Sequence, residues 1–339
     1  MGKGAPDGCE HVILDEEMED IDIPPGWRRP ARTIFEQQWR KILVLGAADI
    51  GKSSFCRFLY RSLSRQGRSV DLIDSDIGQK DIGPPACITA GRPGAEAGYS
   101  IYFVGSVSPV GHFLPVIVGL SRLVERSPAF HKVINTSGLI LGLGRILKGY
   151  KIEALMPDVV VALQRGYELE PILNAYRNHR IVRLRASVRA VSKTQEARRD
   201  ARERAFGDYF AGSQKMALDM DDLLFQRSLL FNGRRADIPG VLYSEKSAEG
   251  MIAVADVKGD SKTGFRAVSP GFAENLLCGV GDGDGTILGL GIVRKIDFRR
   301  RRITLISPVP ADAIKIVQFG DIYVSPEGKE LGRKSPGGF

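Results

Sequence analysis

A glycine-rich segment that ends in a lysine and a hydroxyl residue carries the clearest chemistry in the sequence. Residues 46–53 read Gly-Ala-Ala-Asp-Ile-Gly-Lys-Ser and fit the pattern G-x-x-x-x-G-K-[ST] at every fixed position. In this pattern backbone N–H groups surround phosphate oxygens, the lysine reaches the β- and γ-phosphates, and the hydroxyl binds Mg²⁺. We therefore predict an ATP site with Lys52 as a catalytic residue and Ser53 as a metal ligand. The residues expected to hold the nucleotide are Gly46, Ala47, Ala48, Asp49, Ile50, Gly51, Lys52, Ser53 and Ser54.

Two aspartates follow the next apolar run, in the sequence Asp74-Ser75-Asp76. Two carboxylates at the carboxyl end of a strand can serve one metal site, because one can hold Mg²⁺ while the other accepts a proton from an attacking hydroxyl. We predict that Asp74 and Asp76 are both catalytic. Asp74 is the expected base and, beside Ser53, an expected metal ligand. The alternative is structural: Asp74 would only end the strand, and Asp76 would only begin a turn.

Short apolar runs alternate with helical patterns between residues 40 and 210, and these elements must position the two motifs. Strands that alternate with helices predict a parallel sheet with helices on both faces, which is the α/β fold class of the P-loop NTPases. The glycine-rich segment then lies between the first strand and an amphipathic helix from Lys52 to about Arg65. The runs expected as strands are Ile42–Leu45, Val70–Ile73, Ile101–Val104, Val133–Asn135, Val159–Leu163 and Ile181–Leu184.

The remaining sequence predicts two further parts. Residues 1–30 are acidic and then turn-rich, which indicates an N-terminal tail or an edge packed on the body. Residues 31–212 would form the P-loop domain. Residues 213–339 would form a linker helix, expected at Met216–Leu230, and a smaller C-terminal β-rich domain. The runs expected as strands of that domain are Ile252–Val257, Ile287–Ile296, Ile303–Ser307, Ile314–Gln318 and Ile322–Val324.

The distribution of charge favours a polyanionic partner. The formal net charge is +8, although residues 7–22 hold eight acids and no lysine or arginine. Residues 180–204 hold nine bases against three acids, and residues 294–302 hold six bases against one acid. Such a field favours nucleic acid as the partner. Solvated basic faces without a partner are the alternative, and Arg299–Arg302 also fit an exposed hairpin turn.

Composition argues against two other classes of protein. No apolar run reaches the ~18 residues that a membrane span needs, and the acidic N-terminus lacks the features of a signal peptide. We therefore expect a cytoplasmic protein with no membrane partner. The four cysteines lie far apart without a C-x-x-C pattern, which argues against a zinc site and against disulfides.

Several motifs occur in the order known from one protein family. Asp49 in the glycine-rich loop, followed by Asp-x-Asp-x-Gly-Gln at residues 74–79, resembles the polynucleotide 5′-hydroxyl kinases of the Clp type. Gly105 with Ser108-Pro109 resembles the glycine and Ser-Pro turn of that family. Residues 135–138, Asn-Thr-Ser-Gly, resemble its clasp motif T-x-G-W, and Arg198 with Arg202 resembles its arginine lid. The resemblance covers roughly residues 40–212.

The resemblance implies an ATP- and Mg²⁺-dependent enzyme that phosphorylates the 5′-hydroxyl end of a polynucleotide, RNA more than DNA. It implies that the clasp holds the substrate end near the phosphates and that the lid closes over the transferred group. Arg198 and Arg202 lie four residues apart on one helix face, so both can meet the charge of that group; a solvated basic helix is the alternative. The residues implied to bind substrate are Gln79, Ser108, Thr136 and Gly138.

One position departs from the family pattern. Leu139 stands where the clasp has tryptophan, which removes base stacking at that position. The stretch before the glycine-rich loop also leaves no room for the N-terminal β domain of larger eukaryotic members, so we expect a compact prokaryotic-type member.

Two other functions stay open on the sequence. One is a regulatory NTPase, although the N-K-x-D motif for guanine is missing. The other is a nucleotide-bound scaffold of an RNA-processing complex that has lost catalysis. The sequence leaves any protein partners unknown.

Overall fold

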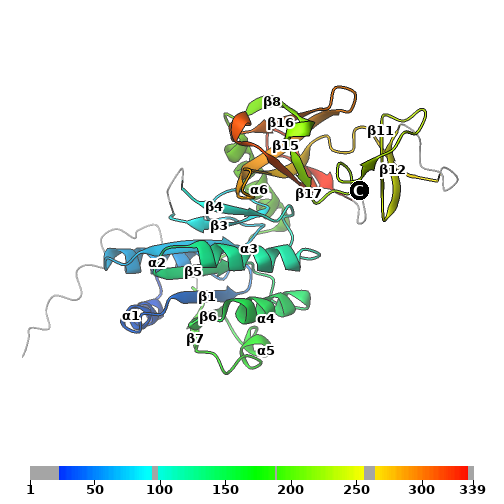
Figure 1. Cartoon of the computed structure of the whole chain (residues 1–339). Helices are drawn as coiled ribbons and strands as arrows, with labels where there is room; N and C mark the ends of the chain where they lie inside the picture. Colours follow the sequence, from blue (N-terminus) through cyan, green and yellow to red (C-terminus); the bar gives the residue numbers. More distant parts are fainter. Residues whose placement is uncertain (1–22, 94–97, 188, 256–263, 335–339) are drawn as a thin grey trace, which may run out of the picture. The chain divides into compact units, whose positions relative to one another are not determined.

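The computed structural model describes residues 23–93, 98–187, 189–255 and 264–334. The chain divides into two units whose segments alternate along the sequence (Figure 1). The first unit takes in the described parts of residues 1–76, 90–99 and 120–194. The second takes in those of residues 77–89, 100–119 and 195–339. The predicted fold class, an α/β P-loop region with a second β-rich region, is confirmed.

Parallel strands form the sheet of the first unit, in the order β2-β5-β1-β6-β7. Except in β7, at the edge of the sheet, their apolar runs are almost entirely buried, as expected for strands covered on both faces. The register sets Asp74 of β2 beside Asn135 of β5 and Ser75 beside Thr136, so the polar ends of these strands meet. The strands are β1 (Lys41–Gly46), β2 (Val70–Ser75), β5 (His131–Thr136), β6 (Val159–Gln164) and β7 (Ile181–Arg185).

Helix α2 (Lys52–Arg65) begins directly after the glycine-rich loop, as predicted. A short 3₁₀ turn, η1 (Pro25–Trp27), and α1 (Arg28–Glu36) precede β1. Trp27 is only 1% exposed and packs edge-on against Phe55 of α2, with ring centroids 5.2 Å apart. The last residues of the predicted tail are therefore packed on the first unit, whereas the acidic residues 7–22 lie outside the described residues.

The other helices follow strands. α4 (Leu143–Leu155) follows β5, and α5 (Glu170–Leu173) follows β6. α3 (Phe113–Arg126) runs through the boundary between the two units near residue 119. Among the described residues, no helix combines the length and the apolar character that crossing a bilayer requires.

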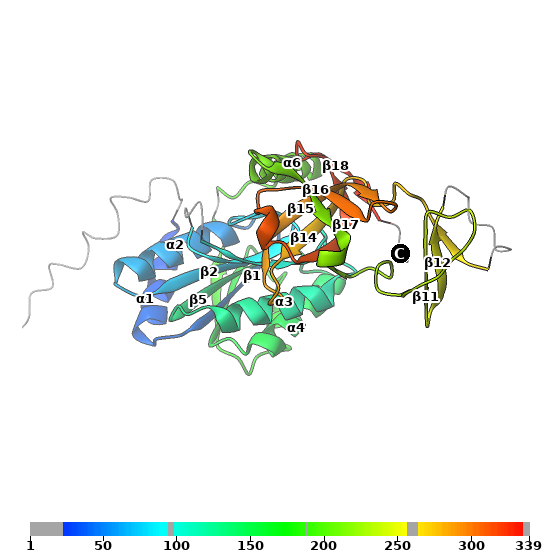
Figure 2. The same ribbon diagram turned by 45° about the horizontal axis from the view of Figure 1, so that its top comes forward.

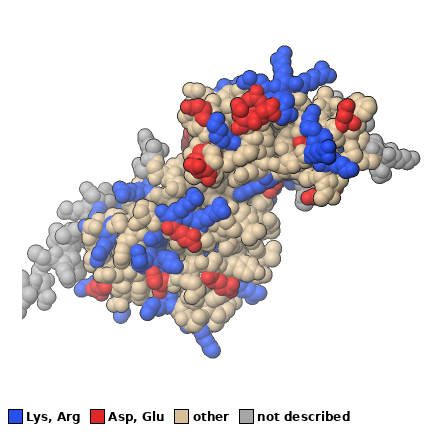
Figure 3. Space-filling model, viewed as in Figure 1, with Lys and Arg blue, Asp and Glu red and all other residues tan. Residues whose placement is uncertain are grey.

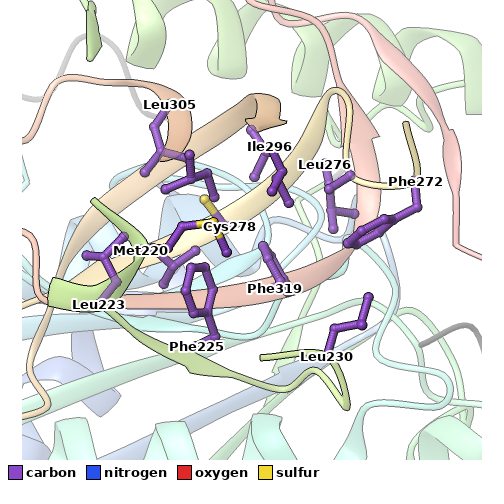
Figure 4. Packing of buried hydrophobic residues seen from close by; sticks show 14 of the residues in the cluster. Met220, Leu223, Phe225, Leu230, Phe272, Leu276, Cys278, Ile296, Leu305 and Phe319 are labelled. Atoms are coloured by element: carbon purple, nitrogen blue, oxygen red, sulfur yellow. The ribbon is translucent and has the colours of Figure 1, made fainter. Parts of the chain in front are cut away.

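A mainly antiparallel sheet dominates the second unit. Its strands follow the order β18-β17-β14-β15-β16-β8, and β9 pairs with β17. Figure 2 shows β14 to β17 close together. Side chains such as Leu276, Cys278 and Phe319 form the apolar core on these strands (Figure 4). The strands are β8 (Gln214–Asp219), β9 (Leu224–Gln226), β14 (Leu276–Gly281), β15 (Ile287–Asp297), β16 (Arg302–Ser307), β17 (Ile316–Val324) and β18 (Glu330–Arg333).

A smaller sheet in the same unit has the order β10-β11-β12-β13. Its residues Tyr243, Ile252, Val254 and Val268 belong to the same buried apolar cluster as those of the larger sheet. Its strands are β10 (Arg234–Arg235), β11 (Tyr243–Ser247), β12 (Gly250–Val254) and β13 (Arg266–Val268). The second unit also holds α6 (Gln195–Phe210) and β4 (Ser100–Phe103), whereas β3 (Cys87–Gly91) contains residues of both units.

The predicted linker helix at Met216–Leu230 is wrong. This segment forms β8, a 3₁₀ turn over Met220–Asp222 and β9. Met216 and Leu218 alternate with exposed residues and pack on the apolar core, so the period is that of a strand. The runs expected as two strands at 314–318 and 322–324 form one strand, β17, and neither β3 nor β14 was expected.

The arginines at 299–302 lie at the turn between β15 and β16, which pair antiparallel. The hairpin interpretation of this segment is therefore confirmed. Arg301 forms an ion pair with Asp221, and Arg302 donates to the carbonyl oxygen of Ala217 at 2.5 Å. Lysine and arginine side chains are visible over many parts of the drawn surface (Figure 3).

Candidate active site

The glycine-rich loop lies between β1 and α2 and has the backbone shape of a phosphate cradle. Gly51 has φ +96° and Asp49 has φ +55°, a region that L residues rarely adopt. A Cβ on Gly46 would lie 2.9 Å from the carbonyl oxygen of Leu163 on β6, so only glycine fits there. Asp49 accepts a hydrogen bond from the backbone N–H of Lys193 at 2.9 Å, which helps hold the loop in this conformation.

Lys52 begins α2 and is only 7% exposed. Its Nζ donates to the carbonyl oxygen of Ala47 within the same loop, at 2.6 Å. Burial lowers the pKa of this ammonium group, and the nearby carboxylates of Asp76, Asp49 and Asp74 oppose that effect. An anionic phosphate beside Lys52 would also favour the charged form.

Asp74 and Ser53 lie at one place, although they are 21 residues apart in the sequence. Asn135 joins them, because its Nδ2 donates to Ser53 Oγ and to Asp74 Oδ1, both at 3.3 Å. Asp74 is completely buried and also accepts from the backbone N–H of Asp76 at 3.1 Å. The two predicted metal ligands, Ser53 and Asp74, are therefore brought together by a residue to which the sequence analysis gave no role.

The segment 135–138, hereafter the clasp loop, packs directly on the glycine-rich loop. A Cβ on Gly138 would lie 2.4 Å from Cα of Ala48, so any side chain there would displace one of the loops. Thr136 is completely buried, and its Oγ1 donates to the carbonyl oxygen of Val44 on β1 at 2.8 Å. Thr136 thus fixes the end of β5, while Gly138 allows the clasp loop to approach the phosphate cradle.

The other predicted residues lie in the second unit. Gln79 donates from Nε2 to the carbonyl oxygen of Arg198 on α6 at 3.0 Å. Ser108 lies in the loop before α3, where its carbonyl oxygen accepts from Ser106 Oγ at 3.1 Å. Arg202 forms a two-bond ion pair with Glu330 of β18, at 2.5 and 3.2 Å, and both side chains are 17% exposed. The predicted lid helix is therefore anchored to β18 within its own unit.

Comparison with known proteins gives the family. The sequence model of the mRNA cleavage and polyadenylation factor CLP1 P-loop matches residues 46–212. A polyribonucleotide 5′-hydroxyl-kinase of Pyrococcus abyssi is 32% identical over 318 residues, covering 86% of this chain and 90% of the relative. Its counterpart in Methanocaldococcus jannaschii is 31% identical, covering 86% and 89%. The chain belongs to the Clp1-type polyribonucleotide 5′-hydroxyl kinase family.

More distant relatives agree with this assignment. The polyribonucleotide 5′-hydroxyl-kinase Clp1 of Xenopus tropicalis is 25% identical and is covered over 69% of its length. A solved complex of Clp1p with Pcf11p aligns with a TM-score of 0.60 at 14% identity, covering 87% of this chain and 78% of that one. The structural match supports the fold. As a P-loop kinase of this family, the chain uses a nucleotide, and its substrate is a nucleic acid.

The Clp1-type site also contains two buried lysines that sequence reasoning missed. Lys148 and Lys151 of α4 have no exposed surface. Nζ of Lys148 donates to the carbonyl oxygen of Ser137 at 2.5 Å, and Nζ of Lys151 donates to Ser75 Oγ at 2.7 Å. They share a helix face with the apolar residues Leu147 and Ile152. That spacing was visible in the sequence and could have marked both lysines as buried.

The donors around Ser53 fit a hard divalent cation. Carboxylate and hydroxyl oxygens meet there, and Oδ1 of Asn135 is buried without a hydrogen-bond partner in the described structure. Within the described residues, no three His, Cys, Asp or Glu side chains form a complete metal cage. Mg²⁺ is usually held by one or two carboxylates together with substrate phosphates, so the sparse donor set suits it.

Proposed function

We propose that this protein transfers the γ-phosphoryl group of ATP to the 5′-hydroxyl end of RNA. The observation that carries the proposal is the junction of three elements in the first unit. Asn135 joins the P-loop hydroxyl of Ser53 to the carboxylate of Asp74, and the clasp loop packs on the P-loop beside them. Nucleotide, metal ligands and acceptor loop thus share one edge of the sheet.

The P-loop and Lys52 bind the triphosphate. Backbone N–H groups at the start of α2 would donate to phosphate oxygens, and the helix dipole adds positive potential. Lys52 then stabilises the negative charge that spreads over the transferred group. Lys52 already lies at the loop, hydrogen-bonded to the carbonyl oxygen of Ala47, and would exchange this acceptor for a phosphate oxygen.

Ser53 and Asp74 would hold Mg²⁺, with Asn135 keeping both oxygens in place. A bound Mg²⁺ neutralises phosphate charge and orients the oxygens. Of Asp74 and Asp76, one carboxylate would help hold the metal and the other would accept the proton of the 5′-hydroxyl. The hydrogen bond from the backbone N–H of Asp76 holds the Asp74 carboxylate at this turn.

The clasp loop positions the acceptor. Thr136 and Gly138 act through the backbone, since the hydroxyl of Thr136 is used by Val44 and Gly138 has no side chain. Leu139 offers an apolar contact in place of a stacked ring. We propose, on the resemblance to the family motifs, that Arg198, Arg202, Gln79 and Ser108 also take part in the transfer. We also propose that the protein works in the cytoplasm, where its cysteines stay reduced.

The test is a transfer assay with γ-labelled ATP. We expect label on an RNA oligonucleotide with a 5′-hydroxyl end, less on the matching DNA, and none on the same RNA with a 5′-phosphate. The 5′-phosphate oligonucleotide is the matched control, because it differs only at the reacting atom. Release of free phosphate without labelled oligonucleotide would instead support an NTPase, and nucleotide binding without turnover would support a scaffold.

A further inference from the structure

The two buried lysines of α4 need an explanation, because removing an ammonium group from water is costly unless strong hydrogen bonds replace its hydration. Lys148 and Lys151 are both completely buried and lie three residues apart on the same helix. Two neighbouring like charges raise the cost further. A helix that needed only an apolar face would carry apolar residues at these positions, so the contacts of the two lysines must supply the reason.

Lys148 holds the clasp loop. Its Nζ donates to the carbonyl oxygen of Ser137 at 2.5 Å and lies 3.3 Å from Ser137 Oγ. Ser137 stands between Thr136, which is tied to β1, and Gly138, which packs on the P-loop. The ammonium group thus holds the middle of the loop from the helix side, while its two neighbours are fixed to β1 and to the P-loop.

Lys151 holds the carboxylate turn at residues 74–76. Its Nζ donates to Ser75 Oγ at 2.7 Å, and Ser75 Oγ in turn donates to the carbonyl oxygen of Asn135 at 2.6 Å. Ser75 stands between the two catalytic carboxylates, and Asn135 is the residue that joins Asp74 to Ser53. Lys151 is therefore linked to the predicted metal ligands through Ser75 and Asn135, whose backbone carbonyl accepts from Ser75 and whose side chain donates to Asp74 and Ser53.

The electrostatic surroundings support a link with the site. Burial lowers the pKa of Lys148 well below its usual value, and the positive charges of Lys151 and Lys52 act in the same direction. Asp76 opposes them. The group lies close enough to Lys52 and Asp76 for these charges to act on it, so a phosphate bound there would act on it as well.

We propose that Lys148 and Lys151 are positioning residues with separate tasks. Lys148 sets the acceptor side of the site through Ser137 and the clasp loop. Lys151 sets the metal side through Ser75 and the carboxylate turn. The inference rests on the proposed kinase function and adds to it separate positioning roles for two lysines one turn apart on α4.

The experiment is a kinetic comparison of Lys148→Met and Lys151→Met with the wild-type protein. Methionine keeps much of the side-chain volume and removes the donors. Arg145→Met is the matched control, because Arg145 is a cation on the exposed side of the same helix. For each protein we would measure KM for 5′-hydroxyl RNA, kcat, the Mg²⁺ concentration at half-maximal rate, and the melting temperature.

We expect Lys148→Met to raise KM for RNA by about tenfold or more without changing the Mg²⁺ requirement, since small displacements of a positioned substrate are costly. Lys151→Met should raise the Mg²⁺ requirement by about tenfold and lower kcat at fixed Mg²⁺, with KM for RNA unchanged. Arg145→Met should match the wild type. Losses that are equal in all kinetic constants and follow the melting temperature, or no losses at all, would show that the lysines only support the fold.

If either methionine variant does not fold, Ser137→Ala and Ser75→Ala test the same two contacts from the other side. Each should shift the same constant as its lysine variant by a smaller factor, and unchanged kinetics in both would overturn the inference. Binding assays separate this inference from the proposed function. If the wild type transfers no phosphate, the function fails, but RNA affinity in Lys148→Met and the Mg²⁺ dependence of nucleotide binding in Lys151→Met still decide the roles of the lysines.

Discussion

The two units of the molecule differ in how many charged side chains they bury and where those side chains lie. Among the described residues, the first unit buries four charged side chains, each at most 7% exposed: Lys52, Asp74, Lys148 and Lys151. In the second unit the corresponding residue is Glu245, which is 2% exposed. Around it, the core of the second unit consists of apolar side chains such as Leu230, Phe225 and Phe319 (Figure 4).

The contacts of these charges explain the difference. The carboxylate of Glu245 accepts from the backbone N–H groups of Phe231 and Gly233, at 2.8 and 3.1 Å, and from the hydroxyl of Tyr243. Neutral donors therefore satisfy it within the fold, and it closes a local turn. Burial, together with the hydrogen bond to Glu245, raises the pKa of Tyr243 to about 12, so this donor stays protonated.

In the first unit the buried charges of both signs gather around the P-loop and the ends of β2 and β5. Lys52 and Asp74 belong to the site itself, and the lysines of α4 hold the two loops beside it. A fold does not gain stability from such a cluster as readily as from apolar packing. Buried charges have neutral hydrogen-bond partners in both units, so the difference lies in their place: Glu245 closes a local turn, whereas the charges of the first unit gather where we propose that a charged ligand binds.

The largest expected effect is the loss of transfer in Lys52→Met. Lys52 is buried but bonded to the loop carbonyl of Ala47, so its removal acts on the phosphate site more than on the core. We expect turnover at saturating ATP to fall by at least ~10³-fold with little change in circular dichroism. Turnover near the wild-type value would show that Lys52 is not catalytic. Its burial would then need a structural explanation.

Asp74→Asn should give the next largest effect. The amide cannot accept a proton and binds Mg²⁺ weakly, so we expect a loss of ~10²–10³-fold in single-turnover rate while ATP still binds. If Asp74 mainly holds the metal, raised Mg²⁺ should restore much of the rate; if it is the base, it should not. Asp76→Asn is the matched variant, and undiminished rates in both would exclude this strand end from the chemistry.

Arg198 and Arg202 of the second unit test whether charged residues there also take part in transfer. Arg198→Ala and Arg202→Ala should lower kcat by about 10²-fold with little change in RNA affinity, because they meet charge that develops during transfer. Arg204→Ala, an exposed arginine of the same helix, is the control. Glu330→Gln weakens the pair that holds Arg202 without touching the lysines or carboxylates of the site. If Arg202→Ala and Glu330→Gln lower only the melting temperature, Arg202 is an anchor of α6 and no part of the transfer machinery.

Features that depend on a local sequence pattern could be predicted, whereas contacts between distant segments could not. The parallel strands of the first unit were predictable because each holds a short apolar run, the purest being Val159–Leu163 on β6. The P-loop was predictable because its glycines and its lysine have fixed spacing. Strand register then brings Asp74 beside Asn135, which no local pattern shows.

The failures also have physical causes. β8 is an edge strand with only one buried face, so its weak alternation at Gln214–Asp219 looked like part of a helix. The tight packing of Gly138 on Ala48 depends on two loops that are distant in the sequence. Lys148 and Lys151 were missed because lysine is normally exposed. The apolar residues Leu147 and Ile152 beside them indicate that this face of the helix is buried.

Glu245→Ala is expected to affect stability alone. Removing the carboxylate leaves the N–H groups of Phe231 and Gly233 without their acceptor, which should lower the free energy of unfolding by ~1–3 kcal/mol. Urea unfolding would measure this loss, and kcat per folded molecule should equal that of the wild type. A fall in kcat with unchanged stability would contradict the view that the second unit buries charge only for its fold.

The smallest expected effect concerns the half-exposed ion pair of the second unit. His112 Nε2 lies 2.8 Å from Asp321 Oδ2. This hydrogen bond raises the pKa of His112 and lowers that of Asp321. The contribution of His112 is therefore complete below its unfolded pKa of ~6.5 and is lost as pH rises through the higher folded value, while that of Asp321 is lost in acid below ~4.

His112→Gln should accordingly lower the melting temperature most at about pH 5.5 and least at about pH 9, a window that follows from the directions of both pKa shifts. The corresponding loss in free energy of unfolding should stay below about 1 kcal/mol, because the side chain of Asp321 is 46% exposed and solvent screens the pair. Thermal unfolding of the wild type and the variant at the two pH values measures it, with Asp321→Asn as the partner variant. An equal fall in melting temperature at both pH values would mean that His112 stabilises the second unit by packing. Its positive charge would then contribute nothing to stability.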